Sequence, residues 1–344
     1  MKCSRFSILQ RLFALLAAVA GLCQADSRAA VPLTTRIQKS GNQSLTLSFD
    51  TRAGVKYRVT SSTNFTDWQK VVTLVDGTGL PQSVSVNITA ERAAYFRAEE
   101  LSLTTITNMV LIPAGTFLMG SSANEVGHDT DEEPITQVIL ASSFWMGKYE
   151  VTQREYLAVM GDNPSSFPGN LSRPVESLTW LEATDYCTRL TALERTAGRL
   201  PAGFVYRLPT EAEFEYACRA GTTTRYYFGE DPNLEIIGSY AWYGDNSAES
   251  PHPVGEKLPN GFGLFDMSGN VREWCADWYT QFFPGGVVIN PRGPGFGEAR
   301  VFRGGSFALT AKSALNCRSA RRDQVTPDRA VFDVGFRVVL ATEP

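Results

Sequence analysis

The sequence of 344 residues contains only two histidines, His128 and His252, which lie far apart in segments rich in turn residues. A histidine-bound iron site needs several imidazoles, and a Ser-His-Asp hydrolase needs a histidine base beside its serine. Neither histidine has such a setting in the sequence. The glycine-rich segment Arg303–Ser306 also lacks the strand, loop and lysine of a phosphate-binding loop. These absences argue against all three kinds of site.

Clusters of basic residues are also absent. The chain has 32 Lys and Arg against 36 Asp and Glu, and no basic block occurs anywhere. Nucleic-acid binding depends on grouped Lys and Arg that neutralise phosphates, so nucleic acid is not an expected partner. Glycine and aromatic residues are plentiful, which favours a loop-rich fold over a helical bundle.

A single strongly apolar run lies at the N-terminus. Basic residues precede Leu12–Cys23, which is too short to span a bilayer comfortably. The pattern predicts a signal peptide over residues 1–25, cleaved after Ala25, with Ala29 and Ala30 as alternative cleavage positions. Acylation of Cys23 is the alternative, disfavoured because Leu22 stands where a small residue is needed. No later segment predicts a transmembrane helix, so we expect an exported, soluble protein, periplasmic or extracellular.

Four cysteines follow the predicted signal peptide: Cys187, Cys218, Cys275 and Cys317. An even number in an oxidising compartment favours disulfides, and four cysteines allow three pairings. We expect Cys275 to pair with Cys317. The other two cysteines would then be either paired or free and buried.

Short strands are predicted in the first part of the mature chain. Ser44–Phe49, Lys56–Thr60 and Gln82–Ile88 alternate in polarity and are separated by turn residues, which predicts a small β-sandwich over residues 31–105. The pattern YRVTSSTNFTDWQKV resembles small β modules attached to exported bacterial proteins. Such a module can bind a glycan or protein, or serve as a spacer; Trp68 is expected in its core.

Residues 106–344 show fewer regular signals. Thr152 and Thr210 are candidate helix N-caps, and Glu213, three residues after Thr210, completes a capping box. Helices are expected at Gln153–Met160, at Ser177–Leu190 and from Glu211 onward. Beyond Gly221, Gly, Pro, Asn and Trp dominate, which predicts irregular structure.

Acidic residues outside these helices have no fixed metal-ligand spacing. The loop Glu125–Glu133 could bind a cation, although such runs are usually solvated surface loops, which is the favoured interpretation. Asp277, Asp245 and Glu176 are free to contribute to some other site. Glu211 and Glu213 are expected to be structural.

Seven motifs follow one another between Asn108 and Leu340: IPAGTFLMGS, YEVTQREY, RPVESLTW, RLPTEAEFEYACRAG, NGFGLFDMSGNVREW, RGGSF and GFRVV. In this order they resemble the formylglycine-generating enzyme family, also called sulfatase-modifying factors. The resemblance implies a compact α+β domain with little regular structure, distantly similar to C-type lectins, over residues 106–344.

The family's enzymes oxidise a sulfatase cysteine to formylglycine with Cu(I) held by two cysteine thiolates, and here the matching positions are Leu309 and Ala314. Hydrocarbon side chains cannot bind a soft ion, so copper is not an expected cofactor. Ser306 is retained at the family's active-site serine, and Arg322 at a nearby arginine. Arg272 replaces the first tryptophan of the usual W-E-W.

The resemblance also implies a structural calcium ion. Asp266, Gly269, Val271 and Glu273 match positions that supply side-chain and backbone oxygens in family members. Calcium takes about six to eight oxygen ligands, so these four positions form a partial shell. The alternative is a tight turn in which Asp266 and Glu273 cap nearby amides.

Two functions of different class follow. The favoured one is an exported non-oxidase, a pseudoenzyme whose domain binds a peptide or exported protein or has a structural role. The alternative is a formylglycine-generating oxidase that acts on exported sulfatases.

Overall fold

The computed structural model describes residues 35–39, 44–50, 56–62, 70–76, 80–87, 95–101, 108–197, 200, 203–308, 310 and 313–342. The predicted signal peptide, Cys23, Trp68 and Leu309 lie outside these residues. Within them, no helix is both long and apolar enough to cross a membrane.

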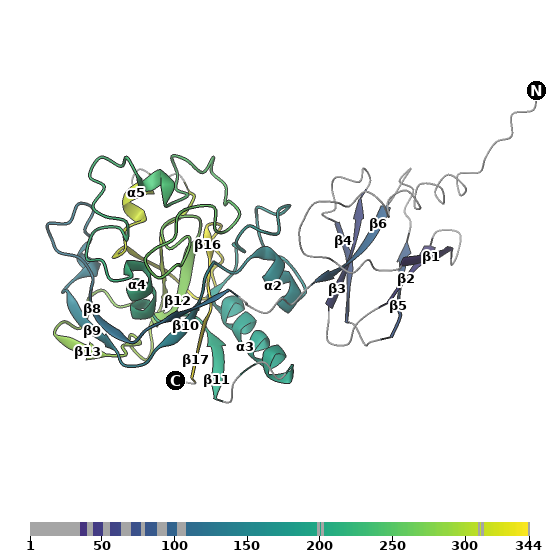
Figure 1. Ribbon diagram of the computed structural model, residues 1–344, viewed down its shortest axis with the longest axis horizontal. Coiled ribbons are helices and arrows are strands. Elements are labelled where there is room, and N and C mark those ends of the chain that lie inside the picture. Colours follow the sequence, from purple (N-terminus) through teal and green to yellow (C-terminus); the bar gives the residue numbers. More distant parts are fainter. Residues whose placement is uncertain are drawn as a thin grey trace, which may run out of the picture.

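The first six strands pair only among themselves. They are β1 (Thr35–Lys39), β2 (Ser44–Phe49), β3 (Lys56–Ser62), β4 (Lys70–Asp76), β5 (Gln82–Asn87) and β6 (Tyr95–Leu101). They form two antiparallel sheets, β1-β2-β5 and β4-β3-β6 (Figure 1). On β2, Leu47 and Phe49 are buried while Ser48 between them is partly exposed, as strand alternation requires. The predicted strands are confirmed; the boundaries 31–105 and 106–344, and the role of this module, stay predictions.

The remaining elements combine short strands with a few helices, an α+β arrangement (Figure 1). The strands are β7 (Met109–Ile112), β8 (Gly115–Met119), β9 (Thr136–Leu140), β10 (Phe144–Gly147), β11 (Phe204–Arg207), β12 (Arg272–Trp278), β13 (Val287–Ile289), β14 (Arg300–Arg303), β15 (Arg322–Val325), β16 (Val334–Gly335) and β17 (Val339–Thr342). They form the sheets β11-β17-β10-β7, β15-β14-β12-β16 and β13-β9-β8. The α-helices are α2 (Gln153–Met160), α3 (Trp180–Thr196), α4 (Glu211–Arg219) and α5 (Ser313–Asn316).

Capping boxes start the three longer helices. Thr152, Thr179 and Thr210 each accept a hydrogen bond from the backbone of the glutamate three residues on, and that glutamate accepts one in return. Helices α2 and α4 therefore begin where the sequence predicts. Helix α3 begins at Trp180 rather than Ser177, because the capping threonine is Thr179.

All residues of helix α4 are buried. Phe214 and Ala217 on α4 pack in a hydrophobic cluster with strands β8, β9 and β10. A second cluster surrounds Trp274 on β12, whose ring meets that of Phe302 edge-on at 5.4 Å. Helix α4 therefore has to bury its charged side chains as well as its apolar ones.

The predicted disulfide is wrong, because all four cysteines are free, buried thiols. Cys275 belongs to the cluster around α4, whereas Cys317 packs with Tyr226 in a different cluster. Burial raises the pKa of Cys317 to about 12 and that of Cys218 to about 11. Cysteine number and compartment could not reveal that the expected partners belong to separate parts of the core.

Candidate functional site

Ser306 follows β14 in a turn that needs glycine. Gly304 and Gly305 both have left-handed backbones, with φ of 97° and 73°. A Cβ atom on Gly305 would lie 2.7 Å from Sγ of Cys317, so glycine lets this turn pack against the end of α5. The turn directs Oγ of Ser306 toward Asp333, to which it donates a hydrogen bond of 2.5 Å.

Arg272 holds the same aspartate from the other side. Its Nη2 donates to both carboxylate oxygens of Asp333, at 2.7 and 2.6 Å, and Asp333 is fully buried. Its Nη1 donates to Asp323 at 3.3 Å, and its guanidinium lies 4.8 Å from the centre of the Phe302 ring. Arg272 therefore neutralises the carboxylate that binds Ser306. Because the Asp333 carboxylate can only accept, the Ser306 hydroxyl is the donor of this hydrogen bond.

Ala314, which the sequence resemblance assigns to one of the family's copper positions, stands on α5. It is 5% exposed, and its carbonyl oxygen accepts a hydrogen bond of 3.1 Å from the hydroxyl of Tyr226. Cys317 lies three residues on, but burial keeps it a thiol, and its Sγ donates to the carbonyl of Ser313. The hydrophobic cluster around it consists of Tyr226, Ile237, Ala241, Tyr243, Ala314 and Cys317. The surroundings of Ala314 are apolar, and neither its methyl group nor the protonated thiol of Cys317 offers a thiolate to copper.

Arg322 is buried, and the carboxylate that it binds is not the one that Ser306 binds. Its guanidinium forms two hydrogen bonds with the carboxylate of Glu211, at 2.7 and 2.9 Å. Arg303 also binds Glu211, at 3.0 Å, and forms an ion pair with Glu215. Arginines of β14 and β15 therefore neutralise Glu211 and contribute to neutralising Glu215 on α4. Glu211 and Arg322 therefore form a buried ion pair, and a structural role for Glu211 stays a prediction.

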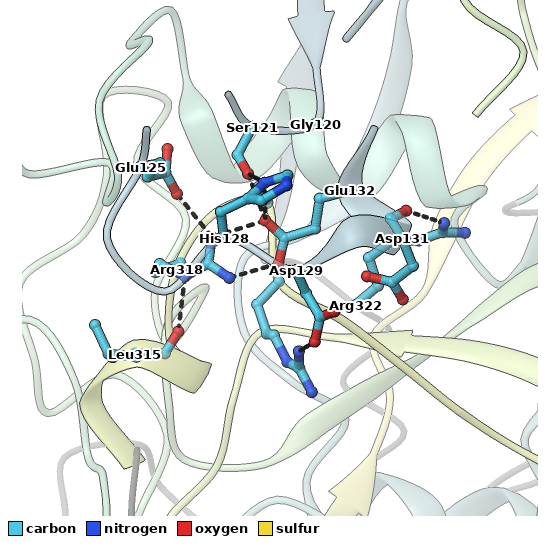
Figure 2. Close-up of polar contacts among 12 residues, drawn as sticks. Gly120, Ser121, Glu125, His128, Asp129, Asp131, Glu132, Leu315, Arg318 and Arg322 are labelled. Atoms are coloured by element: carbon cyan, nitrogen blue, oxygen red, sulfur yellow. Dashed lines mark hydrogen bonds and ion pairs between the residues drawn. The ribbon is translucent and has the colours of Figure 1, made fainter. Parts of the chain in front are cut away.

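The acidic loop is held by arginines that lie far along the chain, as Figure 2 shows. Arg318 donates to Glu125 at 2.7 Å and to Glu132 at 2.8 Å. Arg321 binds Asp129 at 2.9 Å. Glu132 is fully buried, so the expectation of a solvated loop is wrong at this residue. The arginine partners also leave these carboxylates poorly suited to a cation.

Within the predicted calcium loop, Asp266 is 1% exposed and has a left-handed backbone, with φ of 56°. Its Oδ2 accepts a hydrogen bond of 2.7 Å from the backbone of Gly255, and its Oδ1 is buried without a partner. The carboxylate of Glu273 is held by two hydrogen bonds from Arg337, at 2.6 and 2.5 Å. A buried carboxylate oxygen without a partner is the kind of atom that a cation satisfies.

A third carboxylate, that of Glu150, interacts with the other two. It accepts hydrogen bonds from the Asn270 side chain at 2.7 Å and from the Val271 backbone at 3.0 Å. Burial, and after it the charge of Asp266, raises the pKa of Glu150 well above its usual range. Burial likewise raises the pKa of Asp266 to about 6 and that of Glu273.

The charge of Arg337 lowers the pKa of all three carboxylates and so works against the effect of burial. In the part of the chain that the structure describes, no three His, Cys, Asp or Glu side chains are grouped to hold a metal by themselves. Backbone carbonyls, such as those expected of Gly269 and Val271, would have to complete a calcium shell. Within the cluster, the unpartnered Oδ1 of Asp266 is the atom that a hard cation would satisfy, whereas the Glu273 carboxylate is already bound by Arg337.

Asp333, Glu150 and Arg337 are not among the site residues expected from the sequence. Each lies in or beside a motif, YEVTQREY or GFRVV, and that position is the signal that points to them. Three acidic residues that the sequence analysis assigned to no particular site lie in other surroundings. Glu176 accepts from the Phe167 backbone at 2.9 Å, Asp277 accepts from the Glu211 backbone at 2.8 Å, and Asp245 is exposed.

Residues 96–342 match the sequence model of the sulfatase-modifying factor enzyme 1-like domain, and the chain belongs to this family. A formylglycine-generating enzyme of Mus musculus is 30% identical over 294 residues, covering 67% of this chain and 74% of that protein. The chaperone protein LppX of Paenibacillus barcinonensis is 33% identical over 223 residues, covering 52% and 74%. Among solved structures, Treponema denticola variable protein 1 is similar with a TM-score of 0.59 and 29% identity, covering 74% of this chain and 98% of that one.

Proposed function

We propose that this protein is an exported, non-oxidising member of the sulfatase-modifying factor family that binds a peptide or another exported protein. The observation that carries the proposal is Ala314, a buried alanine in an apolar cluster at a copper position of the family. The other copper position is Leu309. Neither side chain can hold Cu(I).

The surroundings of Ser306 support the same proposal. Its hydroxyl donates to Asp333, and Arg272 neutralises that carboxylate. A charge-paired network of this kind orients a side chain but provides no redox-active ligand. In addition, one relative with the same kind of domain is named a chaperone rather than an oxidase. Retention of the domain for binding is consistent with that relative.

The alternative is a formylglycine-generating oxidase, and the similarity to the Mus musculus enzyme favours it. An oxidase would need thiolates from elsewhere in the chain. The four cysteines beyond the predicted signal peptide are all buried, and burial raises the pKa of each one. A thiol that stays protonated is a poor copper ligand.

Competitive titration with a chromogenic Cu(I) chelator separates these functions. We expect Cu(I) to stay bound to the chelator when the folded wild-type protein is added. The matched control is the double variant Leu309→Cys/Ala314→Cys, which restores the family's thiol pair and should withdraw one equivalent of Cu(I). Tight Cu(I) binding by the wild-type protein would overturn the proposal.

We also propose that Asp266, Glu273 and the carbonyls of Gly269 and Val271 hold a structural calcium ion, with Glu150 beside them. The unpartnered Oδ1 of Asp266, in a cluster of three buried carboxylates, supports this site. After chelation with EDTA, calcium alone should raise the melting temperature of the wild-type protein. Asp266→Asn should lose this response, whereas Asp245→Asn, at an exposed position, should keep it. A wild-type melting temperature that ignores calcium would contradict the site.

A further inference from the structure

Buried arginines in this protein are paired with buried carboxylates, with one exception. Six arginines are buried among the residues that the structure describes. Five of them donate a hydrogen bond of 3.0 Å or less to a buried glutamate: Arg219 to Glu215, Arg303 and Arg322 to Glu211, Arg318 to Glu132, and Arg337 to Glu273. The exception is Arg225, which is 6% exposed. Since burying a guanidinium is costly unless a carboxylate neutralises it, this exception needs an explanation.

The charge of Arg225 is only weakly compensated. In the described part of the chain, its one carboxylate contact is Glu230, whose Oε2 lies 3.9 Å from Nε, beyond hydrogen-bonding distance. The Glu230 side chain is 57% exposed, and Nε of Arg225 is buried without a hydrogen-bond partner. The Tyr226 hydroxyl interacts with the guanidinium, but it is neutral and donates to the carbonyl of Ala314. Arg225 therefore holds a positive charge that the protein does not neutralise closely.

A tight turn of the chain fixes Arg225 in this position. The backbones of Tyr226 and Gly229 exchange two hydrogen bonds of 3.1 Å, and the Arg225 backbone donates to Oε1 of Glu230 at 3.4 Å. The carbonyl of Arg225 accepts a hydrogen bond of 2.9 Å from the Ser319 backbone, in the segment that follows α5. A group held in place before binding loses little freedom when its ligand arrives.

We propose that Arg225 is a binding site for a carboxylate of the bound peptide, supplied by an acidic side chain or by the C-terminus. The planar guanidinium matches the two oxygens of a carboxylate, and this protein already pairs Arg322 and Arg337 in that way. The Arg225 side chain keeps 7% of its surface exposed. Glu230, which is more than half exposed, can turn outward and leave its place to the ligand.

This inference rests on the peptide-binding function proposed above and defines the chemistry of the peptide. Through the hydroxyl of Tyr226, the turn that carries Arg225 is hydrogen-bonded to α5 at Ala314. A peptide that binds beside α5 is therefore expected to be acidic. The two proposals can fail separately, because the Cu(I) titration does not involve Arg225 and the test of Arg225 does not involve copper.

Thermal denaturation of the full chain with a model peptide tests the proposal. The probe is an acetylated and amidated Gly-Gly-Glu-Gly-Gly peptide, in which the glutamate side chain is the only carboxylate. We expect the wild-type melting temperature to rise with its concentration, with a dissociation constant of about 1–10 mM. The same peptide with glutamine in place of glutamate should have no effect. Arg225→Gln should abolish the response to the glutamate peptide.

A second variant tests the site without altering the arginine. Glu230→Gln removes the competing carboxylate but keeps an oxygen that accepts from the Arg225 backbone, so it should fold and bind the glutamate peptide up to about fivefold more tightly. The matched control is Glu235→Gln, the same change at an exposed glutamate five residues further along, which should bind like the wild type.

Several outcomes would overturn the proposal. One is a wild-type protein that responds equally to the glutamate and glutamine peptides, or to neither of them. Another is a response to sodium phosphate at matched ionic strength without one to the glutamate peptide, which would assign Arg225 to phosphate. A response that Arg225→Gln retains, or an affinity that Glu230→Gln leaves unchanged, would also contradict it. Because Glu230→Gln is decisive by itself, the test holds even where Arg225→Gln does not fold.

Discussion

At the residue scale, buried charge is the main feature of this molecule, and Asp277 is an example that can be measured. Asp277 is buried on β12 and accepts a hydrogen bond from the backbone of the first residue of α4. Burial, and after it the charge of Glu211, raises the pKa of Asp277 from 3.8 to about 8. The folded state therefore holds this proton over a pH range in which the unfolded chain has released it.

We predict that Asp277 makes stability fall as pH rises. Its contribution is complete below the unfolded pKa and is lost as pH rises toward about 8, with a slope of at most about 1.4 kcal/mol per pH unit. Asp277→Asn keeps the hydrogen-bond acceptor and removes the titration, so its unfolding free energy should depend less on pH. Urea denaturation between pH 5 and pH 9 measures both proteins. Identical pH dependence in the two would contradict the prediction.

The buried pair of Arg318 and Glu132 predicts a large loss of stability. Both side chains are fully buried, so Glu132→Gln leaves the Arg318 charge without its main partner. We expect a loss of about 3–5 kcal/mol in unfolding free energy. The control is Asp185→Asn, which breaks an exposed pair with Arg189 and should cost less than about 1 kcal/mol. If chemical denaturation gave both variants the same loss of unfolding free energy, burial would not determine how much these ion pairs contribute to stability.

At the element scale, helix starts are set by local sequence. The hydroxyl of Thr210 caps α4, and Glu213 both completes the capping box and binds Arg207 at 2.7 Å. We predict that Thr210→Ala lowers the unfolding free energy by about 1 kcal/mol. Thr210→Ser retains the hydroxyl and should lose less. A Thr210→Ala protein as stable as the serine variant would exclude a role for the cap.

These local signals explain how much of the fold the sequence predicts. Capping boxes and strand alternation connect residues a few positions apart, so α2, α4 and the strands β2, β3 and β5 lie where expected. The Arg318–Glu132 pair joins residues 186 positions apart, and no local pattern reveals it. The same limit applies to the contact of Arg272 with Asp333, and it made the predicted disulfide between Cys275 and Cys317 wrong.

At the scale of the whole molecule, residues 96–342 form a domain of the sulfatase-modifying factor family. Arginines from β14, β15 and the segment after α5 hold α4 and the acidic loop in place. The motif order alone identifies the family. The proposed non-oxidising role depends on Leu309 and Ala314 occupying the copper positions.

The most direct test of this account is incubation of the full chain with Cu(I), oxygen and a peptide that carries the sulfatase cysteine motif, followed by mass spectrometry. The formylglycine-generating enzyme of Mus musculus, under the same conditions, verifies that the peptide can be converted. The account predicts that the peptide keeps its cysteine and its mass. Formylglycine in the peptide treated with this protein would contradict it.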